Sequence, residues 1–348
     1  MRRLPIYFLI DVSESMVGDP ITQVENGMRN IIQELRTDPY ALETVFVSVI
    51  AFAGKAKSLS PLTELYKFYP PKFPIGGGTS LGTALNYLMD DMEKSVQKTT
   101  SEMKGDWKPI IFLFTDGTPT DNPNPAIERW QKLYQKKCNL VCISLGDNAD
   151  THLLGKLTEN VLRLKETDEY SFKAFFKWVT ASIKTSSVSV TDAGIDDLQL
   201  APMDGINLEK VNTEEQCVVD ENFAVLMGKC SNTKKTYLVK YAKRIGDIRG
   251  LESLGIKATD YKLVGAFPVD EEIYNSLSEG KSNQNINTMS LRGVPTCPCC
   301  GNQYGVVVCD CGNIMCSDGN TQACPWCGTE GALGEIEEGG MNITRGRG

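Results

Sequence analysis

The chain has 348 residues, a formal net charge of −8 from 36 basic and 44 acidic residues, and 41% hydrophobic residues. This length suits about two domains with ordinary cores, and the acidic balance argues against a protein whose whole surface binds nucleic acid or an anionic membrane. The chain holds twelve cysteines but only one histidine, His152, which excludes mechanisms that need two histidines and histidine-rich zinc sites.

The N-terminal apolar run at 4–10 contains a proline, ends at Asp11 and lacks a small-residue cleavage site. These features predict a buried strand and not a signal peptide. No stretch approaches the roughly 18 apolar residues of a membrane span. We therefore expect a cytoplasmic protein without a membrane partner, in which cysteines serve as thiols or metal ligands and not as disulfides.

The first 185 residues alternate apolar, strand-like runs with segments of helical period. We expect strands at 4–10, 44–52, 109–115, 139–145 and 160–164, with helices between them. This alternation predicts an α/β fold with a doubly wound, mostly parallel sheet covered on both faces. In such a fold, ligands bind at the carboxyl ends of the strands.

The pattern changes near residue 186, where a polar, acidic segment begins. A hairpin is then predicted at 223–228 and 236–241, followed by an extended run at 261–267 and a polar linker at 279–290. We expect an N-terminal domain over 1–185, a β-rich connecting region over 186–290, a cysteine-rich module over 296–328 and a disordered tail over 331–348.

Five oxygen-bearing side chains follow the ends of predicted strands or precede a predicted helix. Asp11, Ser13 and Ser15 alternate after the first strand, Thr79 follows three glycines, and Asp116 ends the strand at 109–115. Each alone could be a helix cap or a turn residue. Together, two carboxylates and three hydroxyls predict a site for Mg²⁺, or another hard divalent ion such as Mn²⁺.

This set resembles the metal-ion-dependent adhesion site (MIDAS) of von Willebrand factor A (vWA) domains, and the resemblance extends over about residues 1–185. It implies that Ser13, Ser15 and Thr79 coordinate Mg²⁺, while Asp11 and Asp116 bind it directly or through water. It also implies an open coordination position for a partner's carboxylate. A domain of this kind binds proteins and is not expected to be an enzyme.

A metal-dependent phosphohydrolase that uses Asp11 and Asp116 is the alternative. The nucleophile position of aspartyl-phosphate phosphatases is occupied by Phe114, and the glycine-rich loop lacks the lysine of a P-loop. Glu14 and Asp121 are the nearest candidate bases, and we expect both to be solvated residues at the rim of the site.

Eight cysteines fall between 297 and 327, and two Cys-x-x-Cys-Gly turns begin at Cys297 and Cys324. A hairpin with three more cysteines lies between these turns. The spacing predicts a structural zinc ribbon with one or two Zn²⁺ ions, and disulfides or a [4Fe–4S] cluster are the alternatives. Cys299 is the doubtful member, and the candidate ligands are Cys297, Cys300, Cys309, Cys311, Cys316, Cys324 and Cys327.

The other four cysteines, Cys138, Cys142, Cys217 and Cys230, are expected to be ordinary buried thiols. The basic cluster between Lys234 and Arg249 is expected to form a solvated hairpin face. The cysteine module has almost no lysine or arginine, so a protein contact is favoured over a nucleic-acid-binding ribbon, which is a further alternative.

The two-part architecture resembles the TerY-like proteins of bacterial tellurite-resistance and stress-response systems. That resemblance implies a scaffold that works with a protein kinase and a PP2C-type phosphatase. We therefore expect a non-enzymatic scaffold whose N-terminal domain binds proteins through Mg²⁺ and whose zinc ribbon is structural.

Overall fold

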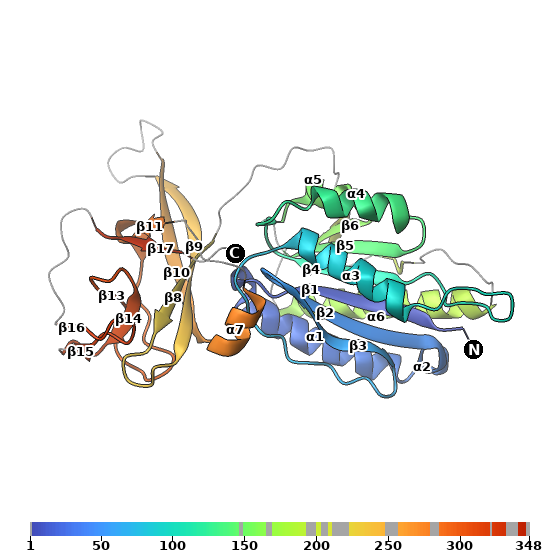
Figure 1. The fold of residues 1–348 in the computed structure, drawn as a ribbon, viewed down its shortest axis with the longest axis horizontal. Helices are drawn as coiled ribbons and strands as arrows, with labels where there is room; N and C mark the ends of the chain where they lie inside the picture. Colours follow the sequence, from blue (N-terminus) through green and yellow to red (C-terminus); the bar gives the residue numbers. More distant parts are fainter. Residues whose placement is uncertain are drawn as a thin grey trace. The chain divides into compact units, whose positions relative to one another are not determined.

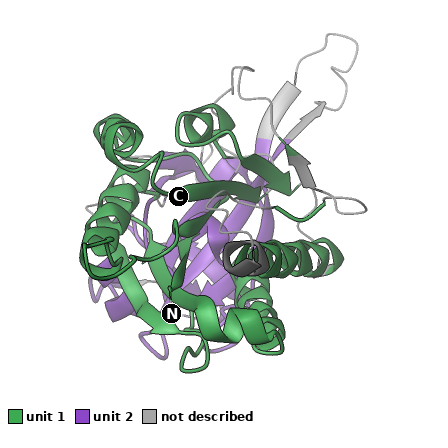
Figure 2. Cartoon of the chain, turned by 90° about the vertical axis from the view of Figure 1, so that its right-hand side faces the viewer, with its two compact units in different colours: residues 1–12, 19–73, 79–219 green, residues 13–18, 74–78, 220–348 purple. Residues whose placement is uncertain are grey.

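The computed structural model describes residues 2–145, 149–164, 169–192, 200–202, 208–210, 223–247, 257–278, 285–320, 322–331 and 340–345. The chain divides into two compact units (Figure 2). Unit 1 comprises residues 1–12, 19–73 and 79–219, and unit 2 comprises residues 13–18, 74–78 and 220–348. Among the described residues, no helix is both long and apolar enough to cross a membrane.

Unit 1 contains a seven-stranded mixed sheet with the order β3-β2-β1-β4-β5-β6-β7. Its strands are β1 (Leu4–Asp11), β2 (Val45–Phe52), β3 (Ala56–Glu64), β4 (Ile110–Thr115), β5 (Asn139–Leu145), β6 (Val161–Leu164) and β7 (Leu208–Lys210). The five central strands, β2, β1, β4, β5 and β6, are parallel, and the two edge strands β3 and β7 are antiparallel to their neighbours. The predicted α/β fold is confirmed.

The strand β3 was not predicted from the sequence. It is an edge strand whose residues are all half-buried or exposed, and it contains Pro61. Its polar residues, Lys57, Ser58 and Ser60, interrupt the apolar run that marks a buried strand.

Helices cover both faces of the sheet (Figure 1). Their bounds are α1 (Asp19–Leu35), α2 (Pro39–Thr44), α3 (Leu81–Ser95), α4 (Asn124–Leu133), α5 (Thr151–Gly155) and α6 (Glu169–Asp192). In α1, the buried residues Val24, Met28, Ile31 and Leu35 recur at helical spacing, so one stripe packs inward.

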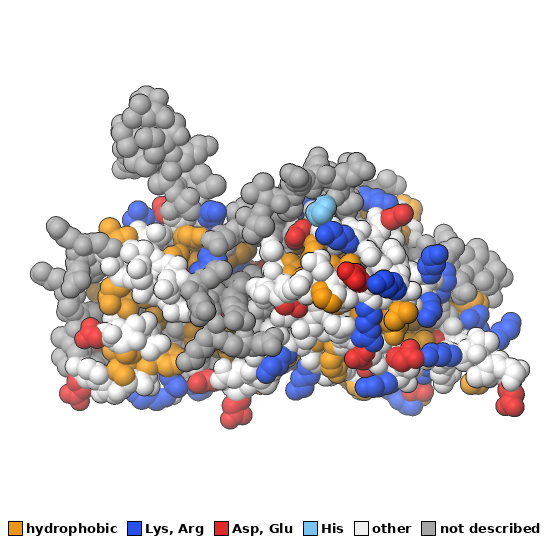
Figure 3. Space-filling view, turned by 45° about the horizontal axis from the view of Figure 1, so that its top comes forward, with side chains coloured by type: hydrophobic (Ala, Val, Ile, Leu, Met, Phe, Trp, Pro, Cys, Tyr) orange, Lys and Arg blue, Asp and Glu red, His pale blue; other side chains and the backbone are white. Residues whose placement is uncertain are grey.

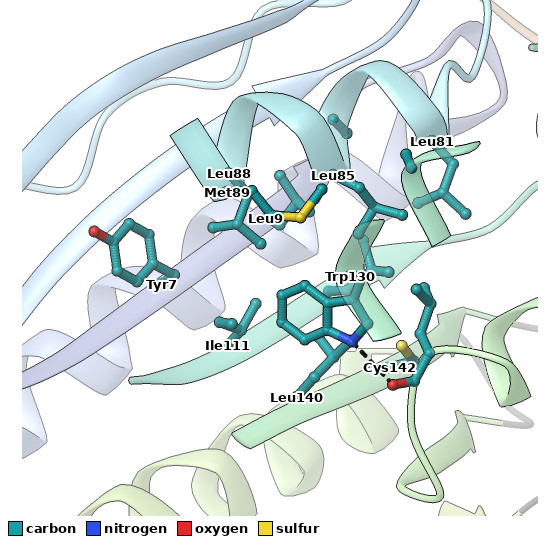
Figure 4. Packing of buried hydrophobic residues seen from close by; sticks show 14 of the residues in the cluster. Tyr7, Leu9, Leu81, Leu85, Leu88, Met89, Ile111, Trp130, Leu140 and Cys142 are labelled. Carbon is teal, nitrogen blue, oxygen red and sulfur yellow. Dashed lines mark hydrogen bonds between the residues drawn. The ribbon is translucent and has the colours of Figure 1, made fainter. Parts of the chain in front are cut away.

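The α3 and α4 face of the sheet is filled by large aliphatic and aromatic side chains (Figure 4). Leu85 and Met89 of α3 contact this core together with Trp130 of α4. The Trp130 ring is fully buried, and its Nε1 donates to the carbonyl oxygen of Leu157 at 3.1 Å. This bond satisfies the indole's polar atom inside the core.

The opposite face is built around aromatic rings of β1, β4 and α6. Phe8 stacks on Phe112 with ring centroids 5.7 Å apart, and Phe114 stacks on Phe176 of α6 at 6.1 Å. Helix α1 approaches the same ring closely, because a Cβ added at Gly27 would lie 2.0 Å from Phe176. A glycine at this position therefore allows α1 and α6 to pack side by side.

Unit 2 contains a six-stranded sheet with the order β12-β10-β9-β8-β14-β13. Its strands are β8 (Phe223–Lys229), β9 (Thr236–Asp247), β10 (Lys257–Pro268), β12 (Leu291–Arg292), β13 (Tyr304–Val308) and β14 (Ile314–Ser317), accompanied by α7 (Glu271–Leu277) and the short 3₁₀ helices η1 (Glu14–Met16) and η3 (Thr288–Ser290). The predicted hairpin is β8 and β9. Because β14 pairs with β8, the hairpin and the cysteine-rich segment share one sheet.

Two small sheets complete unit 2. The strand β15 (Gln322–Ala323) pairs with β16 (Glu330–Gly331), and β11 (Asn285–Asn287) pairs with β17 (Asn342–Thr344). The second pair lies where the sequence predicts a linker and a disordered tail. Ile286 and Ile343 face each other in this pair and are both buried. One apolar residue in each polar stretch gives no periodic signal, which explains why these strands were missed.

Candidate metal centres

The first predicted site begins at the carboxyl end of β1. Asp11 is the last residue of this strand and is fully buried, and the hydroxyl of Thr115 donates to its Oδ2 at 2.6 Å. Asp116 follows β4 and is 5% exposed. Because β1 and β4 are parallel neighbours, both carboxylates lie at the carboxyl ends of the central strands, where ligands bind in this fold.

Thr79 lies in unit 1, immediately before α3, and is buried. Its amide donates to the Thr120 hydroxyl at 2.9 Å, and the Thr120 amide donates to the Thr79 carbonyl oxygen at 2.8 Å. This paired contact ties the loop before α3 to the segment that follows Asp116. The preceding Gly78 has φ +87°, a conformation that favours glycine.

Ser13 and Ser15 belong to unit 2 and are linked to Asp11 through Val12. Both are buried, and their hydroxyl oxygens lie 3.0 Å apart. All five predicted ligands are thus buried side chains that end in oxygen. Two buried carboxylates are costly without a compensating positive charge, so the donor set fits a hard divalent cation.

Two predictions about the surroundings of Ser13 and Ser15 are wrong. Glu14 was expected at a solvated rim, but it is 2% exposed and accepts a hydrogen bond from the Tyr274 hydroxyl of α7. Lys240 was expected on a solvated hairpin face, but it is buried and its Nζ donates to the carbonyl oxygen of Ser15. All of these residues belong to unit 2. They contact one another across more than 200 positions of sequence, a separation that sequence patterns do not reveal.

The cysteines of unit 2 form two groups in which all four sulfur atoms lie within 4.8 Å of one another. Cysteine site 1 consists of Cys230, Cys297, Cys300 and Cys316, and cysteine site 2 consists of Cys309, Cys311, Cys324 and Cys327. Most of site 1 is buried, whereas Cys311 and Cys327 of site 2 are exposed.

The sulfur spacing distinguishes a disulfide from a metal-binding arrangement in these groups. Four Sγ–Sγ distances lie between 3.7 and 3.9 Å: two of them (Cys300–Cys316 and Cys230–Cys316) are in site 1 and two (Cys309–Cys327 and Cys311–Cys324) are in site 2. A disulfide would require about 2.05 Å. Tetrahedral Zn²⁺ with bonds of about 2.3 Å places neighbouring sulfurs about 3.8 Å apart. The spacing therefore fits two four-thiolate zinc sites.

Three cysteine turns share the same backbone pattern. In each, the amide of the cysteine donates to a carbonyl five residues ahead, and the amide four residues ahead donates back to the cysteine carbonyl. The turns begin at Cys230, Cys297 and Cys324. The fourth residue after the cysteine has positive φ: it is a glycine after Cys297 and Cys324, but Lys234, with φ +59°, after Cys230.

Hydrogen bonds to sulfur favour the thiolate form that binds metal. Burial alone would raise the pKa of Cys230, but hydrogen bonds from Thr233, whose amide lies 3.3 Å from the sulfur, lower it to about 6. In site 2, hydrogen bonds with Thr329 lower the pKa of Cys327 to about 6. One thiol in each site therefore has a lowered pKa, whereas burial raises the pKa of Cys297 and Cys300 in site 1.

The prediction that Cys230 is an ordinary thiol is wrong, because it is the fourth member of site 1. The seven predicted zinc ligands are all found in the two groups, and Cys299 is in neither. Cys230 lies far from the cysteine cluster in sequence and is not followed by the Cys-Gly pair of the other turns. The amide pattern around Lys234 identifies it in the structure, but no motif in the sequence does so.

Two further thiols are buried, as the sequence predicts. Cys138 and Cys142 are buried in the core of unit 1, and burial raises the pKa of Cys138 to about 12. His152 of α5 is exposed (pale blue in Figure 3). Cys217 lies outside the described residues.

The family model of the von Willebrand factor type A domain matches residues 6–176, and that of the TerY-C metal binding domain matches residues 220–348. The chain is therefore a vWA-domain protein. More particularly, it belongs to the TerY-like proteins, in which a TerY-C metal binding domain follows the vWA domain. Both cysteine sites fall within the TerY-C match.

Curated relatives match only part of their length. The chain is 26% identical to inter-alpha-trypsin inhibitor heavy chain H6 of Homo sapiens over 159 residues, 44% of this chain and 12% of that protein. It is 26% identical to heavy chain H1 of Bos taurus over 118 residues, 33% of this chain and 13% of that protein. The chain thus spans about an eighth of the length of either relative.

Among solved structures, a von Willebrand factor type A protein from Catenulispora acidiphila is 17% identical, with a TM-score of 0.41 over 53% of this chain and 43% of that one. Proximal thread matrix protein 1 from the mussel byssus, with a zinc-occupied MIDAS motif, is 19% identical, with a TM-score of 0.39 over 53% of this chain and 46% of that one.

Proposed function

We propose that this chain is a non-enzymatic scaffold whose vWA domain binds a partner protein through Mg²⁺ and whose TerY-C domain is folded around Zn²⁺. The observation that carries the first part is the burial of five oxygen-bearing side chains in the motif order of the MIDAS. The observation that carries the second is the zinc-like sulfur spacing at both cysteine sites.

In this proposal, Asp11, Ser13, Ser15, Thr79 and Asp116 hold the Mg²⁺ ion. The bound ion supplies a positively charged attachment point for a carboxylate of the partner. The chain's own residues set the position of the ligands. The Thr115 hydroxyl fixes one oxygen of Asp11, and the paired amide contacts of Thr120 fix the loop that carries Thr79.

The zinc sites are proposed to be structural because both have four cysteine ligands and therefore no open position for water or substrate. We propose Mg²⁺ over Mn²⁺ for the oxygen site and two Zn²⁺ ions for the cysteine sites.

We also propose, from the TerY-like architecture, that the partners are a protein kinase and a PP2C-type phosphatase of a tellurite-resistance or stress-response system in the cytoplasm. Affinity purification with the full chain as bait, from a host that encodes both enzymes, tests this directly. Recovery of neither enzyme in Mg²⁺ buffer would contradict the assignment of partners.

The metal-binding step is tested by titrating Mg²⁺ into the zinc-loaded full chain in a calorimeter. We expect Asp11→Ala to abolish binding, while Asp19→Ala, an exposed carboxylate in the first turn of α1, leaves it unchanged. Partner recovery should follow the same pattern and should be lost in EDTA. Partner recovery that persists after Asp11→Ala would overturn the adhesion-site mechanism.

The absence of catalysis is tested separately with a panel of phosphoesters in Mg²⁺ or Mn²⁺. We expect no turnover above that of the Asp116→Ala variant. Turnover that disappears in this variant would replace the scaffold proposal with a metal-dependent phosphohydrolase.

A further inference from the structure

The helices α1 and α6 of unit 1 form a groove that the proposed metal sites do not use. Its α6 side carries Lys173 and Lys177, which are exposed and lie one helical turn apart. Its α1 side carries side-chain amides at the spacing of one helix face, from Gln23, Asn26, Asn30 and Gln33. The groove comprises two neighbouring hollows of about 340 and 220 Å³ that share Lys173 and Phe176.

A third hollow, of about 560 Å³, is lined by the same two lysines together with mainly apolar groups. Tyr170, which is 76% exposed, and Trp178 supply aromatic surface, and the remaining lining residues are Ala174, Ala181, Ala201 and Pro202. The Trp178 indole nitrogen donates to the Ala201 carbonyl at 2.8 Å, which holds this wall in place. The two lysines therefore border both a polar groove and an apolar hollow.

Neither Lys173 nor Lys177 forms an ion pair with any described residue. The nearby Arg29 is different, because it pairs with Glu25 on its own helix at 3.6 Å. Two unpaired lysines one turn apart are a local positive feature on a chain with a net charge of −8. Such a feature complements a ligand with closely spaced negative charges.

We propose that this surface binds an extended acidic peptide segment of a partner protein. The carboxylates of the segment pair with Lys173 and Lys177, and an adjacent apolar side chain enters the hollow beside Tyr170. The side-chain amides of Gln23, Asn30 and Gln33 have both a donor and an acceptor, so they match the alternating N–H and C=O groups of an extended peptide backbone.

The same features disfavour nucleic acid as the ligand. Duplex DNA carries one negative charge per about 1.7 Å of its axis, whereas this surface offers two unpaired cations and also carries Glu34 at one hollow. A short acidic peptide needs no more positive charge than the two lysines supply. None of the residues of this surface belongs to the proposed metal sites, so the inference does not depend on the proposed function.

The test uses the full, zinc-loaded chain and a fluorescein-labelled decapeptide of alternating glutamate and leucine. Binding is followed by fluorescence anisotropy at low salt. We expect Lys173→Glu with Lys177→Glu to weaken binding at least about tenfold, because two attractive contacts become repulsive. The matched control is Lys132→Glu with Lys136→Glu, which changes the charge equally at two other exposed lysines and should leave binding unchanged.

Two further variants separate charge from shape. Lys173→Gln with Lys177→Gln removes the cations with less disturbance of the helix, and it should also weaken binding. Ala181→Trp fills the apolar hollow without a change of charge and should weaken binding of the leucine-containing peptide. Asp11→Ala and EDTA should have no effect, which separates this surface from the proposed Mg²⁺ site.

Equal weakening by the control pair would overturn the proposal, since it would show only a response to net charge. Equal binding of a decapeptide in which serine replaces glutamate would also overturn it. Tighter binding of a single-stranded oligonucleotide than of the acidic peptide, with the same loss in the lysine variants, would assign the surface to nucleic acid instead.

Discussion

At the scale of single residues, membership of the two cysteine groups is decided by backbone position and not by proximity in sequence. Cys299 lies between Cys297 and Cys300 of site 1 and belongs to neither site, whereas Cys230 completes site 1 from the turn between β8 and β9. A Cys-x-x-Cys turn directs the sulfur atoms of its first and last residues to one point. The side chain of Cys299, which lies between Cys297 and Cys300, is directed elsewhere.

We therefore expect Cys230→Ser and Cys299→Ser to differ in zinc content. The full chain should contain two Zn²⁺ ions, Cys299→Ser should keep both, and Cys230→Ser should keep one because site 1 loses a thiolate. Metal content can be measured by mass spectrometry of the purified, desalted protein. Loss of an ion in the Cys299 variant alone would contradict the assignment of ligands.

The turn after Cys230 makes a second prediction at this scale. Lys234 occupies a left-handed conformation that costs a residue with a Cβ about 1 kcal/mol, whereas the equivalent turns have glycine. Lys234→Gly should therefore stabilise unit 2 by up to about 1 kcal/mol, less the entropy that glycine adds to the unfolded chain. Urea unfolding of the zinc-loaded protein measures the change, with Lys235→Gly as the control at the next residue. Destabilisation by Lys234→Gly alone would contradict the argument.

At the scale of elements, the packing of α1 against α6 depends on one missing side chain. A Cβ at Gly27 would lie 2.0 Å from the ring of Phe176, so Gly27→Ala must push the helices apart or move the ring. We expect a loss of about 1–3 kcal/mol of unfolding free energy, although alanine is otherwise the better helix former.

Thermal and urea unfolding measure this loss, and Asn26→Ala is the control at an exposed position of the same helix. The double variant Gly27→Ala with Phe176→Leu should recover part of the loss, because the smaller side chain leaves room for the new methyl group. An unchanged free energy of unfolding in the Gly27→Ala variant would contradict this prediction, since it would show that the two helices can separate at no cost.

The elements also show how far the sequence predicts this structure. The buried parallel strands are long apolar runs, so β1, β2, β4, β5 and β6 were expected at nearly their observed positions. The edge strand β3 and the strand β17 were not, because edge strands are polar and short ones have no period. Seven of the eight members of the two cysteine groups were named from the sequence because each lies in a local motif. Cys230, Glu14 and Lys240 were not, because their partners lie far along the chain.

At the scale of the whole molecule, the two units should respond differently to loss of metal. Unit 1 has an extensive apolar core beneath α3 and α4, whereas the sheet of unit 2 is joined to both cysteine sites through β14. Zinc binding in small metal-dependent domains contributes roughly 10–16 kcal/mol to folding, which is as large as the whole stability of a typical domain.

A strong zinc chelator should therefore unfold unit 2 while unit 1 stays folded. Hydrogen exchange followed by mass spectrometry should show loss of protection in β8, β9 and β14, with β1, β4 and β5 still protected. Addition of Zn²⁺ should restore protection. Loss of protection in β4 at the same chelator concentration would mean that the folding of the two units is coupled.

The sequence positions of the two cysteine sites also set an order of assembly. In site 2, Cys309 and Cys327 are 18 residues apart, whereas in site 1 Cys230 and Cys316 are 86 residues apart. Closing a longer loop costs more chain entropy and takes longer. If both sites bind Zn²⁺ as proposed, we expect site 2 to capture its ion while unit 2 is still largely unfolded, and site 1 to close only after β14 has met β8. In the proposed zinc-loaded chain, the ion at site 1 would be a reversible cross-link between distant parts of the chain, comparable to a disulfide but governed by zinc supply and not by redox conditions.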